Sequence, residues 1–291
     1  MPNEQTLGEL WAAMRYEMEQ EGLDQSAARF ILEEVYGTCS FSTILTKMSE
    51  TVQPAEKERA ERWMRRYVGG EPLQYIFNEA HFYGYPLYVD EAVLIPRPET
   101  EELVHYVLEH VRPHYPNGAR MADIGPGSGA IAIALQKEWP EASVVATDIS
   151  EEALAVARRN DETYKTSIDF RRGDLLEPLA HETYDIIVSN PPYIAVDEKG
   201  EMTQSTIDYE PDLALYSEED GYSHYRQLFE HVARVVAPDG WVIVEIGHRQ
   251  AERVRALAEQ HVAPCSVEVV QDMSGKDRIV VVRRTVEEDQ S

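Results

Sequence analysis

Residues 189–194, with the sequence Ser-Asn-Pro-Pro-Tyr-Ile, combine the residue types that can hold a flat NH₂ group. The prolines lack N–H groups and leave nearby carbonyls free to accept, and the side-chain oxygen of Asn190 is a further acceptor. Two such acceptors can grip both hydrogens of a planar NH₂ and aim its nitrogen at an electrophile, while Tyr193 offers a flat face. We therefore predict catalytic roles for Asn190, Pro191, Pro192 and Tyr193 in group transfer to an amide or amine nitrogen.

A second candidate site is the glycine-rich turn at residues 123–129, with the sequence Asp-Ile-Gly-Pro-Gly-Ser-Gly. Its glycines allow a ligand to approach the backbone closely, and the helix expected to follow offers N–H groups at its N-terminus. With Ala130 the turn also fits the looser dinucleotide pattern, so it does not distinguish NAD from S-adenosylmethionine. Asp148, at the end of the next expected strand, is a candidate for binding ribose hydroxyl groups in either case.

The elements that must position these two segments alternate between strand and helix after Gly118. Near-continuous apolar runs at 186–188 and 242–244 indicate strands covered on both faces, which is typical of a mostly parallel sheet between helices. Seven strands are expected, at 120–124, 143–148, 167–172, 185–189, 240–246, 266–271 and 278–283. Helices are expected at 99–110, 128–139, 151–160 and 222–236. Ligands bind such sheets at the C-terminal ends of the strands, where the glycine turn and residues 189–194 both fall.

The N-terminal part of the chain has a helical pattern. Apolar residues share helical faces in two sets, Leu7, Leu10, Trp11 and Met14, and Ala27, Phe30, Ile31 and Val35. Short aromatic and β-branched runs at 75–77, 81–83 and 86–89 then predict a hairpin. We expect a helical domain over 1–73, a β-hairpin linker over 74–93 and a catalytic domain over 94–286.

Charge and composition limit the possible partners. The net charge is −26, and only six of the 27 basic residues are lysine. A nucleic-acid-binding protein normally carries a basic stripe, so direct nucleic-acid binding is not expected. The acidic excess also fits a protein kept soluble in high salt.

Other features bear on the compartment and on metals. No apolar run approaches the ~20 residues that a membrane helix needs, and the N-terminus lacks the pattern of a signal peptide. The two cysteines, Cys39 and Cys265, lie far apart, which fits a reducing compartment. His110 and His114 have the spacing of helical metal ligands, but Pro113 lies between them and would break that turn. We expect a cytoplasmic protein with no membrane contact and no metal site.

Motifs spread over nearly the whole chain point to one family. They lie at 70–76 (Gly-Glu-Pro-Leu-Gln-Tyr-Ile), 94–101 (Leu-Ile-Pro-Arg-Pro-Glu-Thr-Glu), 123–129, 189–194, 209–211 (Tyr-Glu-Pro), 220–221 with 225–226, 245–247 and 275–278. Together they resemble the release-factor glutamine methyltransferases of the HemK/PrmC type. The Asn-Pro-Pro-Tyr element alone is shared with adenine-N6 DNA methyltransferases, whereas the first two motifs are much more specific.

The resemblance implies a Rossmann-like methyltransferase sheet, a helical domain that helps to bind the release factor, and S-adenosylmethionine as cofactor. It implies that Asn190–Tyr193 hold the glutamine of the Gly-Gly-Gln motif of peptide chain release factors, whose side-chain nitrogen N5 receives the methyl group. The cofactor-binding residues that it implies are Gly125, Pro126, Gly127, Ser128 and Gly129 for the methionine part, Asp148 for ribose, Leu175 beside adenine, and Asn190.

Two residues depart from the family pattern. Pro126 replaces the usual threonine, which removes an N–H and a hydroxyl from the glycine turn, and Phe77 stands where the family usually continues toward a glycine. Two further residues have open interpretations: Arg97 either lines the substrate channel or forms a structural ion pair, and Glu245 either touches the active site or is a solvated or capping carboxylate.

Two rival functions remain open at this stage. An adenine-N6 nucleic-acid methyltransferase would use residues 189–194 equally well, because adenine also carries an exocyclic NH₂. The charge and the lack of a recognisable target-recognition domain disfavour it. A nicotinamide-dependent oxidoreductase would need a hydride-transfer site, which the sequence does not offer.

Overall fold

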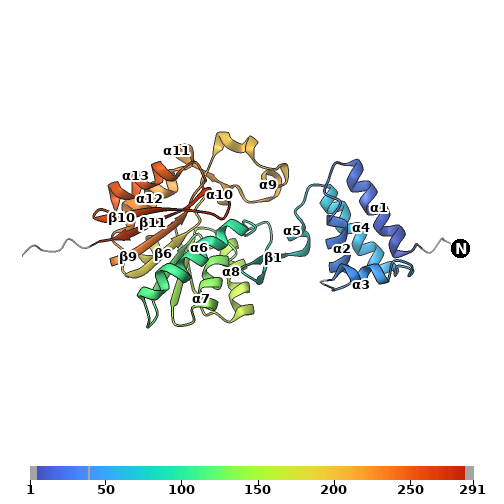
Figure 1. Cartoon of the computed structure of the whole chain (residues 1–291), viewed down its shortest axis with the longest axis horizontal. Helices are drawn as coiled ribbons and strands as arrows, with labels where there is room; N and C mark the ends of the chain where they lie inside the picture. The colour runs from blue at the N-terminus through green and yellow to red at the C-terminus, as the bar shows by residue number, and fades with distance from the viewer. Residues whose placement is uncertain (1–4, 39, 286–291) are drawn as a thin grey trace, which may run out of the picture. The chain divides into compact units, whose positions relative to one another are not determined.

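The computed structural model describes residues 5–38 and 40–285, so Cys39 lies outside the described residues. The chain divides into two compact units, one formed by Met1–Asn78 with Gln204–Tyr209 and the other by Glu79–Thr203 with Glu210–Ser291. Figure 1 shows the elements of both units. Within the described residues no helix is long and apolar enough to cross a membrane.

The first unit is helical. Its helices are α1 (Leu7–Gln20), α2 (Ala27–Val35), α3 (Phe41–Thr46), α4 (Pro54–Val68), α5 (Leu73–Phe77) and α9 (Gln204–Tyr209). Thr6 caps α1, accepting from Glu9 N while the Glu9 carboxylate accepts from Thr6 N. The expected apolar faces form its core, with one correction. Phe30 is 45% exposed, and the buried face of α2 turns instead through Ala28 and Leu32.

The prediction of strand structure at 75–77 was wrong, because these residues belong to α5. A run of three apolar residues does not distinguish a strand from a short buried helix, and here Tyr75 and Ile76 are both buried. The helix ends at Asn78, whose φ of 55° is left-handed, a conformation that asparagine tolerates well. The hairpin itself starts one residue later.

The second unit contains that hairpin and a seven-stranded sheet. In the hairpin, β1 (Glu79–Phe82) pairs with β2 (Tyr85–Tyr88). The sheet has the order β10-β11-β9-β6-β3-β4-β5. Its strands are β3 (Arg120–Ile124), β4 (Ser143–Asp148), β5 (Asp169–Arg172), β6 (Tyr184–Ser189), β9 (Val236–Glu245), β10 (Cys265–Gln271) and β11 (Asp277–Arg284). Five strands are parallel and β11 is antiparallel to both its neighbours, so the predicted mostly parallel sheet of seven strands is confirmed.

Helices cover both faces of this sheet (Figure 1). One face packs against α6 (Glu101–Tyr106), which continues as a π-helical turn (Val107–Val111), and α7 (Ala130–Glu138). The other face packs against α12 (Ser223–Val232) and α13 (Ala251–His261). The remaining α-helices are α8 (Glu151–Tyr164), α10 (Asp212–Leu215) and α11 (Glu218–Gly221). Short 3₁₀ helices lie at Pro98–Thr100, Arg112–His114, Glu177–Leu179 and Val196–Glu201. A separate two-stranded sheet pairs β7 (Ile194–Ala195) with β8 (Tyr216–Ser217).

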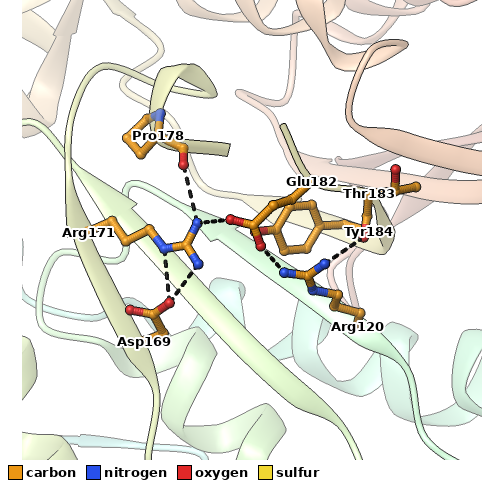
Figure 2. A network of polar contacts seen from close by, with 7 residues as sticks. All are labelled: Arg120, Asp169, Arg171, Pro178, Glu182, Thr183 and Tyr184. Atoms are coloured by element: carbon orange, nitrogen blue, oxygen red, sulfur yellow. Dashed lines mark hydrogen bonds and ion pairs between the residues drawn. The ribbon is translucent and has the colours of Figure 1, made fainter. Parts of the chain in front are cut away.

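A network of charged side chains connects the N-terminal ends of β3 and β6 to Asp169 and Arg171 of β5 (Figure 2). The Glu182 carboxylate bridges the guanidinium groups of Arg120 and Arg171. Arg171 also binds Asp169 at 2.7 Å, and the Arg120 guanidinium lies 4.7 Å from the centre of the Tyr184 ring. Arg120 and Glu182 lie at the ends of β3 and β6 opposite to those that carry the two motifs, so we assign the network to stability.

Replacing Glu182 with glutamine is expected to lower the free energy of unfolding by about 1–2 kcal/mol, because two guanidinium groups then face each other without the bridging charge. Arg120 is 41% exposed, so solvent screens part of this effect, and the loss is expected to shrink in 1 M salt. Urea unfolding at low and high salt measures the loss of unfolding free energy and its dependence on salt. Glu177→Gln, at an exposed carboxylate in the same connection, is the control, and an equal loss in both variants would contradict the bridging role.

Candidate active site

The sheet topology brings the two sequence motifs together. The glycine turn leaves the C-terminal end of β3, and residues 190–193 leave the C-terminal end of β6, its direct neighbour. The register pairs Ile124 with Ser189, and the Ser189 hydroxyl donates to the Ile124 carbonyl at 2.7 Å. The chain continues from β3 to β4 on one side and returns to β6 on the other, so this is the point where the strand order reverses and ligands bind.

The glycine turn requires glycine at three positions. Gly125, Gly127 and Gly129 have φ of 75°, 53° and 83°, in the region that other residues rarely adopt. A Cβ on Gly125 or Gly127 would meet nothing within 4 Å, so both face open space. All three N–H groups donate within the protein, to Thr147 O, Asp148 Oδ2 and Pro126 O respectively. The turn therefore offers a close backbone surface more than a set of free donors.

Asp148 stands beside this turn at the end of β4. Its Oδ2 accepts from Gly127 N at 3.2 Å and its Oδ1 accepts from Ser150 N at 3.0 Å. Burial raises the pKa of the Asp148 carboxyl, and these backbone donors oppose the shift. Each oxygen keeps a second lone pair, so the carboxylate remains able to accept from a diol.

Leu175 is held in an unusual backbone conformation. Its φ of 43° is rare for a bulky residue and costs of order 1–3 kcal/mol, which the surroundings must offset. The Thr147 hydroxyl donates to the Leu175 carbonyl at 2.7 Å and helps to fix it. The leucine side chain is thereby kept beside Asp148.

A cavity of about 230 Å³ connects these features. Predicted site residues that line it are Gly125, Pro126, Gly127, Ser128, Asp148, Leu175, Asn190 and Pro192. Gly129, Pro191 and Tyr193 are not in its wall. Gly129 precedes α7, Pro191 is buried, and the half-buried Tyr193 packs against the core between the sheet and α12 and α13. Most of the predicted site therefore surrounds one cavity.

The NH₂ and the oxygen of the Asn190 carboxamide have different surroundings. Its Nδ2 donates to the Thr100 hydroxyl at 3.1 Å, and Asn190 lies on the cavity wall. Within the part of the chain that the structure describes, Oδ1 forms no hydrogen bond. The amide oxygen is therefore left as an acceptor.

Tyr193 is anchored through its backbone. Gln250 Nε2 donates to the Tyr193 carbonyl at 2.9 Å, while Gln250 Oε1 accepts from Gly247 N at 2.9 Å. Burial raises the pKa of the Tyr193 hydroxyl above its usual range, and the nearby Glu245 carboxylate adds to this effect. The hydroxyl consequently stays protonated at neutral pH.

The structure decides both open interpretations. Arg97 lines the cavity and also forms a 2.5 Å ion pair with the buried Glu210, whose carboxylate accepts from Ile95 N as well. Both proposed positions for Arg97 therefore hold. Glu245 is 1% exposed, so it is neither solvated nor a surface cap; it lies beside Thr100 and Tyr193.

Several lining residues were not singled out from the sequence. They include Phe82, Thr100, Ile131, Ile149, Leu213 and His224. Thr100 lies inside the motif at 94–101, which was a usable signal. Phe82 and His224 belong to elements far from either motif in sequence, and only tertiary structure places them here.

Comparison with known proteins identifies the family. The PrmC N-terminal domain family matches residues 9–77, and the methyltransferase small domain family matches residues 104–210. The release factor glutamine methyltransferase of Streptococcus pneumoniae is 37% identical over 276 residues, covering 95% of this chain and 98% of the relative. That of Lactococcus lactis is 41% identical over 239 residues, covering 82% and 87%. The chain belongs to the release factor glutamine methyltransferase family.

The fold agrees with this assignment. A methyltransferase from Pyrococcus furiosus superposes with a TM-score of 0.55 at 17% identity, covering 78% of this chain and all of that one. As a family member the chain is an S-adenosylmethionine-dependent methyltransferase. The cavity fits that methyl donor, because open space adjoins Gly125 and Gly127, a carboxylate lies at Asp148, and apolar side chains follow at Ile149 and Leu175.

Replacing Asp148 with alanine is expected to weaken binding of S-adenosylmethionine by roughly 1–3 kcal/mol, since the ribose hydroxyl groups lose their acceptor. Calorimetric titration with the cofactor or its demethylated product measures this. Glu151→Ala, an exposed carboxylate three residues later, removes the same charge and is expected to bind normally. Unchanged affinity in Asp148→Ala would contradict the assignment of Asp148 to ribose.

Proposed function

We propose that this enzyme transfers the methyl group of S-adenosylmethionine to the side-chain amide nitrogen of the glutamine in the Gly-Gly-Gln motif of peptide chain release factors. The relatives from Streptococcus pneumoniae and Lactococcus lactis are named release factor glutamine methyltransferases, which supports a glutamine of a release factor as the substrate. The structural observation that carries the proposal is the Asn190 side chain, whose Nδ2 is bound by Thr100 while its oxygen has no partner among the described residues.

The geometry suits an amide. A primary amide has two hydrogens in one plane, and Asn190 Oδ1 together with a backbone carbonyl of the Pro191–Pro192 segment accepts both. An amide nitrogen is a poor nucleophile because its lone pair is shared with the carbonyl. Fixing both N–H bonds localises that lone pair and aims it at the methyl carbon.

The chemistry needs no general base before transfer. When bound, S-adenosylmethionine supplies a methyl group on a positively charged sulfur. The new N–C bond forms as the S–C bond breaks, and the nitrogen then loses one proton to solvent. The role of residues 190–193 is therefore to orient and to exclude water.

The proposed division of labour follows the two compact units. The helices up to Asn78 carry none of the cavity residues, so we assign them to recognition of the release factor. The cavity belongs wholly to the second unit, which performs the transfer. A substrate that acts in translation places the enzyme in the cytoplasm, and no direct contact with nucleic acid or membrane is needed.

Mass spectrometry of release factor incubated with enzyme and S-adenosylmethionine tests the proposal. We expect one added methyl group on the glutamine of the Gly-Gly-Gln motif. A release factor with that glutamine changed to alanine is the matched control and should gain none. A duplex DNA substrate in parallel tests methylation of adenine, and methyl transfer to DNA without transfer to release factor would overturn the proposal.

A further inference from the structure

The hydroxyl of Thr100 lies near both the Asn190 side chain and a buried carboxyl group. Thr100 is 4% exposed, and its Oγ1 accepts from Asn190 Nδ2 at 3.1 Å. The carboxyl group is that of Glu245, at the C-terminal end of β9 and 1% exposed, and the Thr100 hydroxyl is among the groups that stabilise its charged form. Glu245 Oε2 is buried and, within the described residues, has no hydrogen-bond partner. A buried carboxylate oxygen without a partner is costly and calls for an explanation.

The two ends of a carboxamide have nearly the same shape and opposite polarity, so packing alone cannot decide which end faces the cavity. A hydroxyl has one hydrogen to donate. If Thr100 donates that hydrogen toward the Glu245 carboxylate, only its lone pairs remain for Asn190. Asn190 must then present its NH₂ to Thr100 and its oxygen to the cavity.

From this arrangement we infer that Thr100 and Glu245 are positioning residues for the reaction, which fix the Asn190 carboxamide with its acceptor oxygen toward the substrate. This inference rests on the proposed role of Asn190. Thr100 also lines the cavity, but in this inference both residues act through Asn190.

The protonation state of Glu245 decides whether Thr100 can hold Asn190 in this orientation. Burial raises the pKa of Glu245 to about 7, and the Thr100 and Tyr193 hydroxyls and the Arg278 guanidinium counter that shift. The titratable and charged groups that face Glu245 are Tyr193 after β6, Glu99 before α6, Arg278 on β11 and Tyr225 on α12. Arg278 is itself paired with Asp272 at 3.2 Å, so its charge is shared.

Protonation of Glu245 reverses the direction of the hydrogen bonds from Glu245 through Thr100 to Asn190. Its O–H donates to Thr100, whose hydrogen is then free to bond Asn190 Oδ1. The carboxamide turns over and presents NH₂ to the substrate NH₂, and two donors cannot bind each other. We expect turnover to fall as the pH decreases through about 7, the pKa of Glu245.

Three variants test the inference in single-turnover assays at saturating cofactor and substrate. Thr100→Val removes the hydroxyl at nearly constant shape and is expected to reduce the rate about tenfold or more, with little change in KM. Thr100→Ser keeps the hydroxyl and is expected to restore most of the rate. Glu245→Leu removes the acceptor for the Thr100 hydroxyl and is expected to be slow at every pH, without the acid limb near neutrality. Thermal unfolding and cofactor titration check that each variant is folded.

A double-mutant cycle separates this inference from the proposed function. In an Asn190→Ala background, Thr100→Val is expected to have no further effect, because the group it positions is gone. If Asn190→Ala is slow but Thr100→Val and Glu245→Leu match the wild type, or if the losses simply add, the positioning role is overturned and the proposed function stands. If Asn190→Ala itself is fast, the assignment of the site fails first.

Discussion

Asn190→Ala is expected to slow methyl transfer at least about a hundredfold, which corresponds to about 3 kcal/mol of lost transition-state stabilisation. The substitution removes the free acceptor Oδ1 and leaves one N–H of the substrate amide unpaired in the cavity. The loss is expected in the rate of the bound complex and much less in cofactor affinity, because we expect the glycine turn and Asp148, which line the same cavity, to hold most of the methyl donor. Single-turnover kinetics beside calorimetric titration with cofactor separates the two quantities.

Tyr193→Phe is the matched control for this experiment. It changes the same loop but keeps the ring and the backbone anchor to Gln250. The hydroxyl stays protonated at neutral pH, so its removal changes no charge of its own, but Glu245 loses a donor that lowers its pKa. A mild effect is therefore expected at alkaline pH, where Glu245 is ionised in both proteins. A normal rate in Asn190→Ala would show that another group holds the amide, and residues 190–193 would no longer be the catalytic centre.

Gly221→Ala is expected to lower both the stability and the rate from a position outside the cavity wall. Gly221 has a φ of +88°, and a Cβ there would lie 2.3 Å from the Tyr193 carbonyl oxygen and 2.8 Å from Gln250 Nε2. These are the two atoms of the hydrogen bond that anchors Tyr193. We expect a loss of about 2–4 kcal/mol in the free energy of unfolding and a rate at least about tenfold lower, since the loop carrying Asn190 must shift.

Gly275→Ala isolates the cost of backbone conformation. Gly275 has a similar φ of +74°, but a Cβ there would meet nothing within 4 Å. Its cost is expected to be about 1–2 kcal/mol with a normal rate. Urea unfolding and single-turnover kinetics compare the two variants, and equal effects would mean that the contact with Tyr193 is unimportant.

The sequence predicted the parts of the site that depend on local pattern. The glycines at 125, 127 and 129 form a recognisable ligand-binding turn between a strand and a helix. Runs of buried apolar residues predicted β6 and β9. Because the C-terminal ends of parallel strands lie along one edge of a sheet, the sequence also predicted that the glycine turn and Asn190 lie at the same edge. The neighbouring positions of β3 and β6 agree with that expectation.

Contacts between distant segments were beyond local pattern. Thr100 and Asn190 are separated by 90 positions, and nothing in either neighbourhood specifies their pairing. Glu245 looked equally like a capping carboxylate, because a glutamate at a strand end is most often solvated. The secondary structure of short segments was mispredicted for a different reason. Three apolar residues at 75–77 fit a helix or a strand equally well, and the left-handed Asn78 that ends the helix leaves no periodic signal in the sequence.

One buried side chain shows where the catalytic unit begins. Asn160, on α8 and 2% exposed, accepts from Tyr88 N at 2.7 Å and donates to the Tyr88 and Ser128 carbonyls, both at 2.9 Å. It thus ties strand β2 of the hairpin to the glycine turn.

This bond pattern has a consequence for any attempt to separate the two units. A fragment that starts at Leu94, after the hairpin, would lose Phe82 and Leu87 from the core and leave the Asn160 amide with unpaired groups in the interior. A fragment that starts at Glu79 keeps all of these contacts. The hairpin is therefore part of the catalytic unit, and the boundary between the units at this point of the chain lies between Asn78 and Glu79. A fragment cut there also leaves Gln204–Tyr209 without the rest of the first unit.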